Sequence, residues 1–142
     1  MAARLGYARA MERKFGKAPS AAEIEAIART SLNRLPEPFA AHLRDVVLAV
    51  EELADDETLD SMGIDDPFDL TGLYYGLPVG QKSVDLSGTL PDRIFLYRRA
   101  ILDEWASEGE TLEHLVHHIL VHEVGHHFGL SDEDMHRLED EA

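Results

Sequence analysis

The segment from Thr111 to Gly129, "TLEHLVHHILVHEVGHHFG", limits the possible folds of this chain more than any other. Its apolar residues recur three and four positions apart, as on one face of a helix. Thr111 is a favourable N-cap, and Gly129 is a favourable helix stop. We therefore predict one long helix between them. At about 100° per residue, its buried stripe comprises Leu112, Leu115, Val116, Ile119 and Leu120.

Three polar residues, His122, Glu123 and His126, fall within or beside the sector of that stripe, one turn further on. Residues four apart share a helix face, so both imidazoles can reach one cation while Glu123 points at water bound to it. Buried polar groups are costly unless they are satisfied, and a metal ion with its bound water would satisfy all three. "HEVGH" therefore predicts a metal site of the zincin type. The alternative is that both histidines are hydrogen-bonded core residues and that Glu123 pairs with an arginine such as Arg98 or Arg99.

A third ligand is expected just beyond the helix. Gly129 lets the chain reverse, which brings the next side chains back toward the metal. Asp132 stands where the extended HExxHxxGxxH motif places its third ligand, and we predict that it binds the ion. Glu133 and Asp134 are alternative ligands. All three acids would otherwise simply add charge to the first turn of a final helix.

The remaining histidines of this region lack an acidic or glycine context. We predict surface or supporting roles for them, and not ligation. They are His114, His117, His118, His127 and His136.

Composition narrows the class of protein. The 142 residues suit one compact domain, 1–142, in which residues 1–19 could form a loosely packed extension. The 13 basic and 28 acidic residues give a net charge of −15, which would repel nucleic acid and anionic membranes. With no cysteine, any metal must bind through His, Asp or Glu. No apolar run suits a signal peptide or a membrane span, so we expect a cytoplasmic protein.

The rest of the chain indicates a small sheet with helices. Ser20, followed by Glu23 as in a capping box, begins a predicted helix that ends near Arg34. Residues 51–69 are acidic and are expected to form a loop with a short helix, since the spacing of a calcium loop is missing. We predict a last helix in "EDMHRLED" and strands in "VVLAVEEL", "LTGLYYGLP" and "DRIFLYRRAIL".

The segments "GLYYGLP", "LPDRIFLYRRAIL" and "HEVGHHFGLSDEDM" resemble the minimal zincin-like metallopeptidases, a family of small, mostly bacterial proteins. The resemblance implies an α+β fold with a three-stranded mixed sheet, packed helices and the HExxH helix near the carboxyl terminus. It also implies one zinc ion per chain, with His122 and His126 as ligands, Glu123 as general base and Asp132 as candidate third ligand.

These observations predict a zinc-dependent peptidase that cleaves peptides or unfolded proteins. Glu123 would take a proton from water and pass it to the leaving amine. Tyr74, Tyr75 and Tyr97 are candidates for stabilising the oxyanion. One alternative is a non-catalytic module that holds zinc or docks a partner. Another is a histidine-rich metal buffer that binds several ions weakly.

Overall fold

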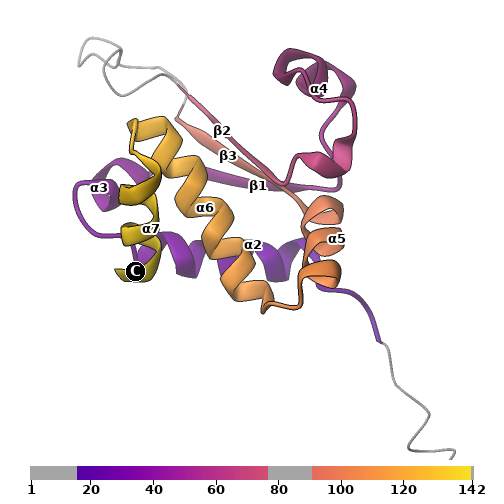
Figure 1. Cartoon of the computed structure of the whole chain (residues 1–142), viewed down its shortest axis with the longest axis horizontal. Coiled ribbons are helices and arrows are strands. Elements are labelled where there is room, and N and C mark those ends of the chain that lie inside the picture. The colour runs from indigo at the N-terminus through magenta and orange to yellow at the C-terminus, as the bar shows by residue number, and fades with distance from the viewer. Residues whose placement is uncertain (1–15, 77–90, 142) are drawn as a thin grey trace, which may run out of the picture.

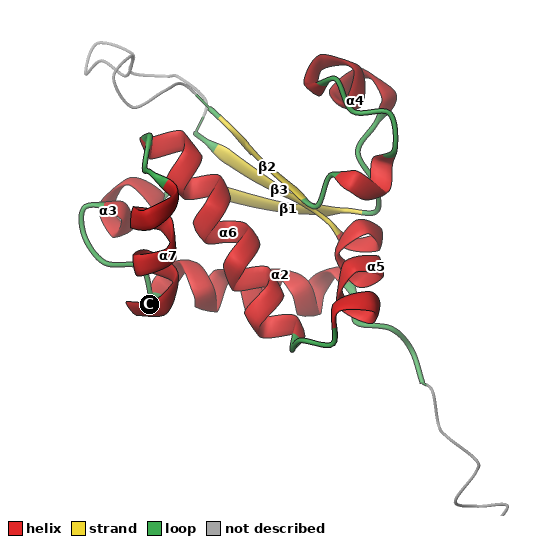
Figure 2. Ribbon diagram, in the orientation of Figure 1, coloured by secondary structure: helices red, strands yellow, loops and turns green. Residues whose placement is uncertain are grey.

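The structure is a computed structural model that describes residues 16–76 and 91–141. This part of the chain forms six α-helices, one short 3-10 helix and one three-stranded sheet (Figures 1 and 2). The α+β class predicted from the sequence is confirmed. In chain order the elements are α2 (Ala21–Asn33), α3 (Phe39–Leu43), β1 (Val47–Glu51), α4 (Asp56–Met62), η1 (Pro67–Asp69), β2 (Gly72–Tyr75), β3 (Arg93–Tyr97), α5 (Arg98–Glu108), α6 (Leu112–Phe128) and α7 (Asp132–Glu141).

The sheet is mixed, as expected, with strand order β1-β3-β2. β1 runs parallel to the central strand β3, and β2 runs antiparallel to it. Within the described residues β2 is therefore an edge strand. It leads toward residues 77–90, which lie outside the description, as do residues 1–15 of the predicted extension.

Local signals place α2 as predicted. The Ser20 side chain accepts the Glu23 N–H, and the Glu23 side chain reaches back to the Ser20 backbone in a capping box. The buried face of α2 includes Ile24, Ala28 and Leu32, three or four residues apart. Burying this stripe fixes the helix against the core, because a helix of this length gains most of its stability from packing.

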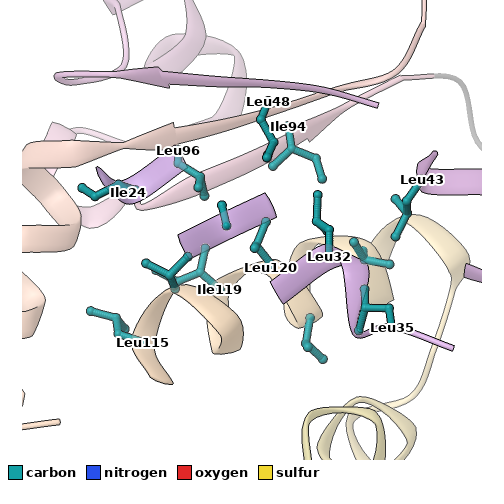
Figure 3. Close-up of a cluster of buried hydrophobic side chains, with 14 of the residues drawn as sticks. Ile24, Leu32, Leu35, Leu43, Leu48, Ile94, Leu96, Leu115, Ile119 and Leu120 are labelled. Atoms are coloured by element: carbon teal, nitrogen blue, oxygen red, sulfur yellow. The ribbon is translucent and has the colours of Figure 1, made fainter. Parts of the chain in front are cut away.

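Helix α6 also has the predicted ends. The Thr111 side chain accepts the His114 N–H, and Gly129 adopts a left-handed φ of 73° after the last turn. The whole predicted apolar stripe is buried. Figure 3 shows Ile119 and Leu120 of α6 facing Leu48 and Ile94 of the sheet, with residues of α2 beside them. Helix α6 thus lies inside the core layer, covered by the sheet, α2 and α7.

One boundary was predicted wrongly. The strand expected over "DRIFLYRRAIL" ends at Tyr97, and the rest of that segment begins α5. Tyr97, Ala100 and Ile101 are buried at a spacing of three and four, which suits a helix. Gly109 stops α5 with a left-handed φ of 73°. The short helix α3 was not predicted either.

The two faces of the sheet are covered differently. The main core lies between the sheet, α2 and α6, whereas a smaller cluster packs around Leu59 of α4 and Tyr97. Figure 1 shows α4 on the opposite side of the sheet from α6. α4 and η1 occupy the acidic segment in which a short helix was expected. None of the helices in the described part of the chain combines the length and the apolar character needed to cross a membrane.

Candidate metal centre

Four imidazoles gather where α7 crosses the outer face of α6. His122 is central: the ring centroid of His118 lies 4.2 Å away, that of His136 6.1 Å and that of His126 6.2 Å. His118, His122 and His126 are spaced by four residues, so they form one line along α6. His136 faces them from α7. Folding thus concentrates nitrogen donors around the first histidine of "HEVGH".

His122 fits a metal ligand. Its Nε2 is buried and has no hydrogen-bond partner among the described residues. Burial lowers the pKa of His122, and the neighbouring His118 lowers it further. The imidazole is therefore held neutral, which is the form that donates a lone pair to a metal. An ion at this position would satisfy an atom that the described residues leave without a partner.

Glu123 faces the edge of the sheet. Its Oε2 accepts a hydrogen bond from the Tyr74 N–H of β2 at 3.3 Å. Burial raises the pKa of Glu123, and the Tyr74 hydrogen bond and His126 only partly oppose this. The predicted alternative, an ion pair with an arginine, is wrong for Arg98, which binds the Glu52 carboxylate at 3.1 Å instead. A half-buried carboxylate with a raised pKa is suited to exchange protons.

The contact with Tyr74 follows from the strand register. The Tyr97 N–H donates to the Thr71 carbonyl at 2.9 Å, and Tyr74 lies opposite Ile94. Hydrogen-bonded and non-hydrogen-bonded pairs alternate in an antiparallel ladder, so Tyr74 and Gly72 turn their N–H and C=O groups away from β3. Glu123 therefore lies at the edge of β2 that faces away from β3.

The other two predicted ligands are less enclosed. His126 and Asp132 are both exposed, and Asp132 begins α7. In the part of the chain that the structure describes, they do not belong to a group of metal donors within 4.8 Å of one another. The helices run antiparallel here, since His118 meets Glu139 and His122 meets His136. Continued in the same order, this register places Asp132 near the level of His126.

Sequence reasoning missed a second donor group. His118, His122 and Glu139 offer ligand atoms that all lie within 4.8 Å of one another. The His118 Nδ1 lies 2.6 Å from a carboxylate oxygen of Glu139. The spacing of His118 and His122 was visible in the sequence, but Glu139 joins them only through the packing of α7.

The comparison with protein families agrees with this geometry. The model of the family described as zincin-like metallopeptidase matches residues 43–142, which include the whole sheet, α6 and α7. The chain belongs to this family. A search of curated proteins found no match. The family expected from "GLYYGLP" and "HEVGHHFGLSDEDM" is thus confirmed, and the candidate site lies inside the matched region.

The three tyrosines considered for this zincin-like protein have different surroundings. Tyr97 is only 2% exposed and belongs to the second core cluster, where burial raises its pKa to about 12. The Tyr74 hydroxyl donates to Asp92 at 2.7 Å, and its ring stacks on His127 at 3.9 Å. Tyr75 is 67% exposed at the sheet edge. Because side chains alternate along a strand, Tyr75 faces the opposite side of the sheet from Tyr74 and α6.

The remaining histidines of the zincin-like helix have separate roles. His114 is exposed and bonds Glu110 at 3.2 Å, as expected of a surface residue. His117 is only 4% exposed, so its role is a supporting one inside the protein. Its Nδ1 bonds the Ser31 hydroxyl of α2, and its Nε2 lies 3.3 Å from the Glu139 carbonyl of α7. Burial lowers the pKa of His117, so it is a neutral residue that ties three helices together.

Proposed function

We propose that this zincin-like protein is a zinc-dependent peptidase in which Glu123 is the general base. The observation that carries the proposal is the position of Glu123. It follows His122, whose buried Nε2 has no hydrogen-bond partner among the described residues, and it lies against the edge of β2 that faces away from β3. A proton-exchanging carboxylate is thus held between a candidate metal ligand and a place where a peptide can lie.

The residues that would hold zinc are His122, His126 and Asp132. Two imidazoles and a carboxylate form a donor set that zinc accepts in catalytic sites, where a fourth position stays open. Zinc, when bound, would acidify a water molecule and polarise the scissile carbonyl.

The chain's own residues would move the proton. Glu123 would take it from the attacking water and deliver it to the leaving amine, and its raised pKa favours both steps. The Tyr74 N–H fixes one carboxylate oxygen, so the carboxyl group is oriented before a substrate arrives. The other oxygen is left to meet water.

The substrate class follows from the strand edge and the charge. The Tyr74 N–H is taken by Glu123, but the outward Tyr74 C=O and the outward N–H and C=O of Gly72 suit pairing with an extended peptide, which a folded protein does not offer. The net charge of −15 and the exposed acids Asp132, Glu133 and Asp134 favour basic residues near the cut. We expect peptide or unfolded-protein substrates, no nucleic-acid or membrane partner, and a cytoplasmic location.

The test is cleavage of matched peptide libraries that differ only in charge, at low and high salt. The protein is purified without a polyhistidine tag and loaded with zinc, and His114→Ala serves as a control on the same helix. We expect cleavage of unfolded peptides with a preference for Lys and Arg that weakens as salt is added. Zinc binding without any cleavage would instead favour a non-catalytic module. Preferential cleavage of acidic peptides would contradict the substrate assignment.

A further inference from the structure

The donor group formed by His118, His122 and Glu139 lies on a different side of His122 from the general base. Glu123 extends from α6 toward β2, where it meets the Tyr74 N–H. His118 and Glu139 lie between α6 and α7, with the His118 Nδ1 2.6 Å from the Glu139 carboxylate. Glu139 therefore approaches His122 from α7, whereas Glu123 extends away toward β2.

Glu139 is an unusual carboxylate in so acidic a protein. Its side chain is only 11% exposed. Among the described residues, His118 is the one basic side chain that pairs with this carboxylate. Lys and Arg, which ordinarily stabilise a buried acid, form no ion pair with it there. The Glu139 carboxylate instead lies close to two imidazoles, those of His118 and His122.

The chemistry of the group suits a divalent metal. Two imidazoles and one carboxylate are ligands of zinc and of similar transition-metal ions. All three ligand atoms already lie within 4.8 Å of one another. In addition, the buried Nε2 of His122 has no hydrogen-bond partner among the described residues. A cation here would balance the buried charge of Glu139 and satisfy His122.

We propose that His118, His122 and Glu139 form a second site for a divalent ion of the zinc type, which we call the outer site. The outer site shares His122 with the HExxH pair. A neutral imidazole has one acceptor nitrogen, so His122 serves one ion at a time. An ion in the outer site is therefore withheld from the HExxH site, and occupancy of the two sites is mutually exclusive.

The existence of the outer site rests only on its three donors, whereas the exclusivity rests on the proposed function. An ion in the outer site would lie between His118 of α6 and Glu139 of α7, away from the β2 edge that Glu123 contacts. The protein then holds its metal in a form that Glu123 cannot use. Excess zinc should accordingly not fill both sites of one chain.

The experiment measures affinity for zinc ions in the full untagged chain by competition with a chromophoric chelator. Cobalt absorption spectra report the ligand set independently of activity. His126→Ala removes the HExxH pair and leaves the outer site complete. Glu139→Gln and His118→Ala are then added to that variant separately. Glu139→Gln preserves the backbone carbonyl that His117 bonds. His114→Ala is the matched control, because it lies on the same line of α6 outside both sites.

We expect His126→Ala to retain one zinc ion per chain, with a cobalt spectrum that differs from that of the parent. Adding Glu139→Gln or His118→Ala should weaken this residual binding at least about tenfold, whereas adding His114→Ala should leave it unchanged. Circular dichroism and thermal unfolding establish that each variant is folded. If the histidine variant fails to fold, the conservative glutamine variant decides.

Two results would overturn the outer site. One is that His126→Ala binds no zinc. The other is residual binding that neither Glu139→Gln nor His118→Ala weakens, which would mean that His118 only pairs with Glu139 through a proton. The proposed function fails separately: if parent and His126→Ala bind zinc equally and both depend on Glu139, the outer site stands and the HExxH assignment falls.

Discussion

Two histidines of α6, five residues apart, show how the same side chain can serve structure or chemistry. His117 is buried, and both of its ring nitrogens have partners, the Ser31 hydroxyl and the Glu139 carbonyl. His122 also has a buried nitrogen, but its Nε2 has no partner in the described part of the chain. Burial alone therefore does not distinguish a functional histidine. The distinguishing feature is a buried polar atom that the protein itself does not satisfy.

The difference arises from what faces each residue. His117 lies between α2 and α7, which present a hydroxyl and a backbone carbonyl. His122 lies among His118, His126 and His136. Burial, together with these neighbouring imidazoles, lowers the pKa of His122, so its ring keeps a lone pair to offer. A metal ion fits the second environment and not the first.

The largest expected effect concerns Glu123, the carboxylate beside the unsatisfied histidine. Glu123→Gln should lower peptide hydrolysis by about 10²–10⁴-fold, the usual contribution of a general acid–base group. The amide keeps an oxygen for the Tyr74 N–H, so the fold and the zinc content should be preserved. Steady-state cleavage and metal analysis of the same preparation check this. Cleavage at the parent rate would remove Glu123 from the role of base.

The next prediction sets the two histidines directly against each other. His117→Ala should lower the free energy of unfolding by roughly 1–3 kcal/mol, because the buried Ser31 hydroxyl loses its partner. Its affinity for zinc should stay unchanged. His122→Ala should abolish zinc binding at both proposed sites and leave the stability of the metal-free protein almost unchanged. Urea unfolding with chelator present, together with zinc titration, measures both quantities. Equal effects of the two substitutions on zinc would break the comparison.

Local sequence signals explain which parts of the fold were predictable from the sequence. The ends of α2 and α6 depend on Ser20, Glu23, Thr111 and Gly129, each of which acts within a few residues of its own position. The strand ending at Tyr97 was extended too far, because "RRAIL" has apolar residues that suit either a strand or a helix. The burial of Tyr97 and Ala100 in the second core cluster is what favours the helix α5 over a longer strand.

The site was predictable only where its residues share one helix. "HEVGH" identified His122 and Glu123, because helical spacing alone brings them together. The structural role of His117 depends on Ser31, 86 residues away in sequence, and the outer site depends on Glu139 of α7. These contacts are set by the packing of three helices, which no local spacing encodes. The Tyr74 contact with Glu123 likewise requires the register of β2 on β3.

The third prediction tests whether α7 must pack closely on α6, since α7 contacts both His117 and His122. A Cβ on Gly125 would overlap the buried sulfur of Met135, so the helices pack closely at this point. Gly125→Ala should force α7 away and lower the free energy of unfolding by roughly 1–3 kcal/mol. Met135 fills the core here, and Met135→Ala in the same chain should restore part of the lost helix contact. Chemical unfolding of the single and double variants measures the coupling. If the losses in free energy of unfolding of the two single variants simply add in the double variant, Gly125 and Met135 do not act through a common contact.

The smallest expected effect distinguishes the exposed acids at the start of α7. Asp132, Glu133 and Asp134 are all exposed, but only Asp132 has the spacing of a third ligand. The antiparallel order of contacts between α6 and α7 places it near the level of His126. Asp132→Ala should therefore weaken zinc binding about tenfold or more, whereas Glu133→Ala and Asp134→Ala should change it less than about twofold, through surface charge alone. The measurement is competition for zinc with a chelator at low and high salt. A loss caused by surface charge fades as salt is added, but the loss of a ligand persists. If Glu133→Ala or Asp134→Ala has the larger, salt-independent effect, that residue and not Asp132 completes the metal centre opposite His122.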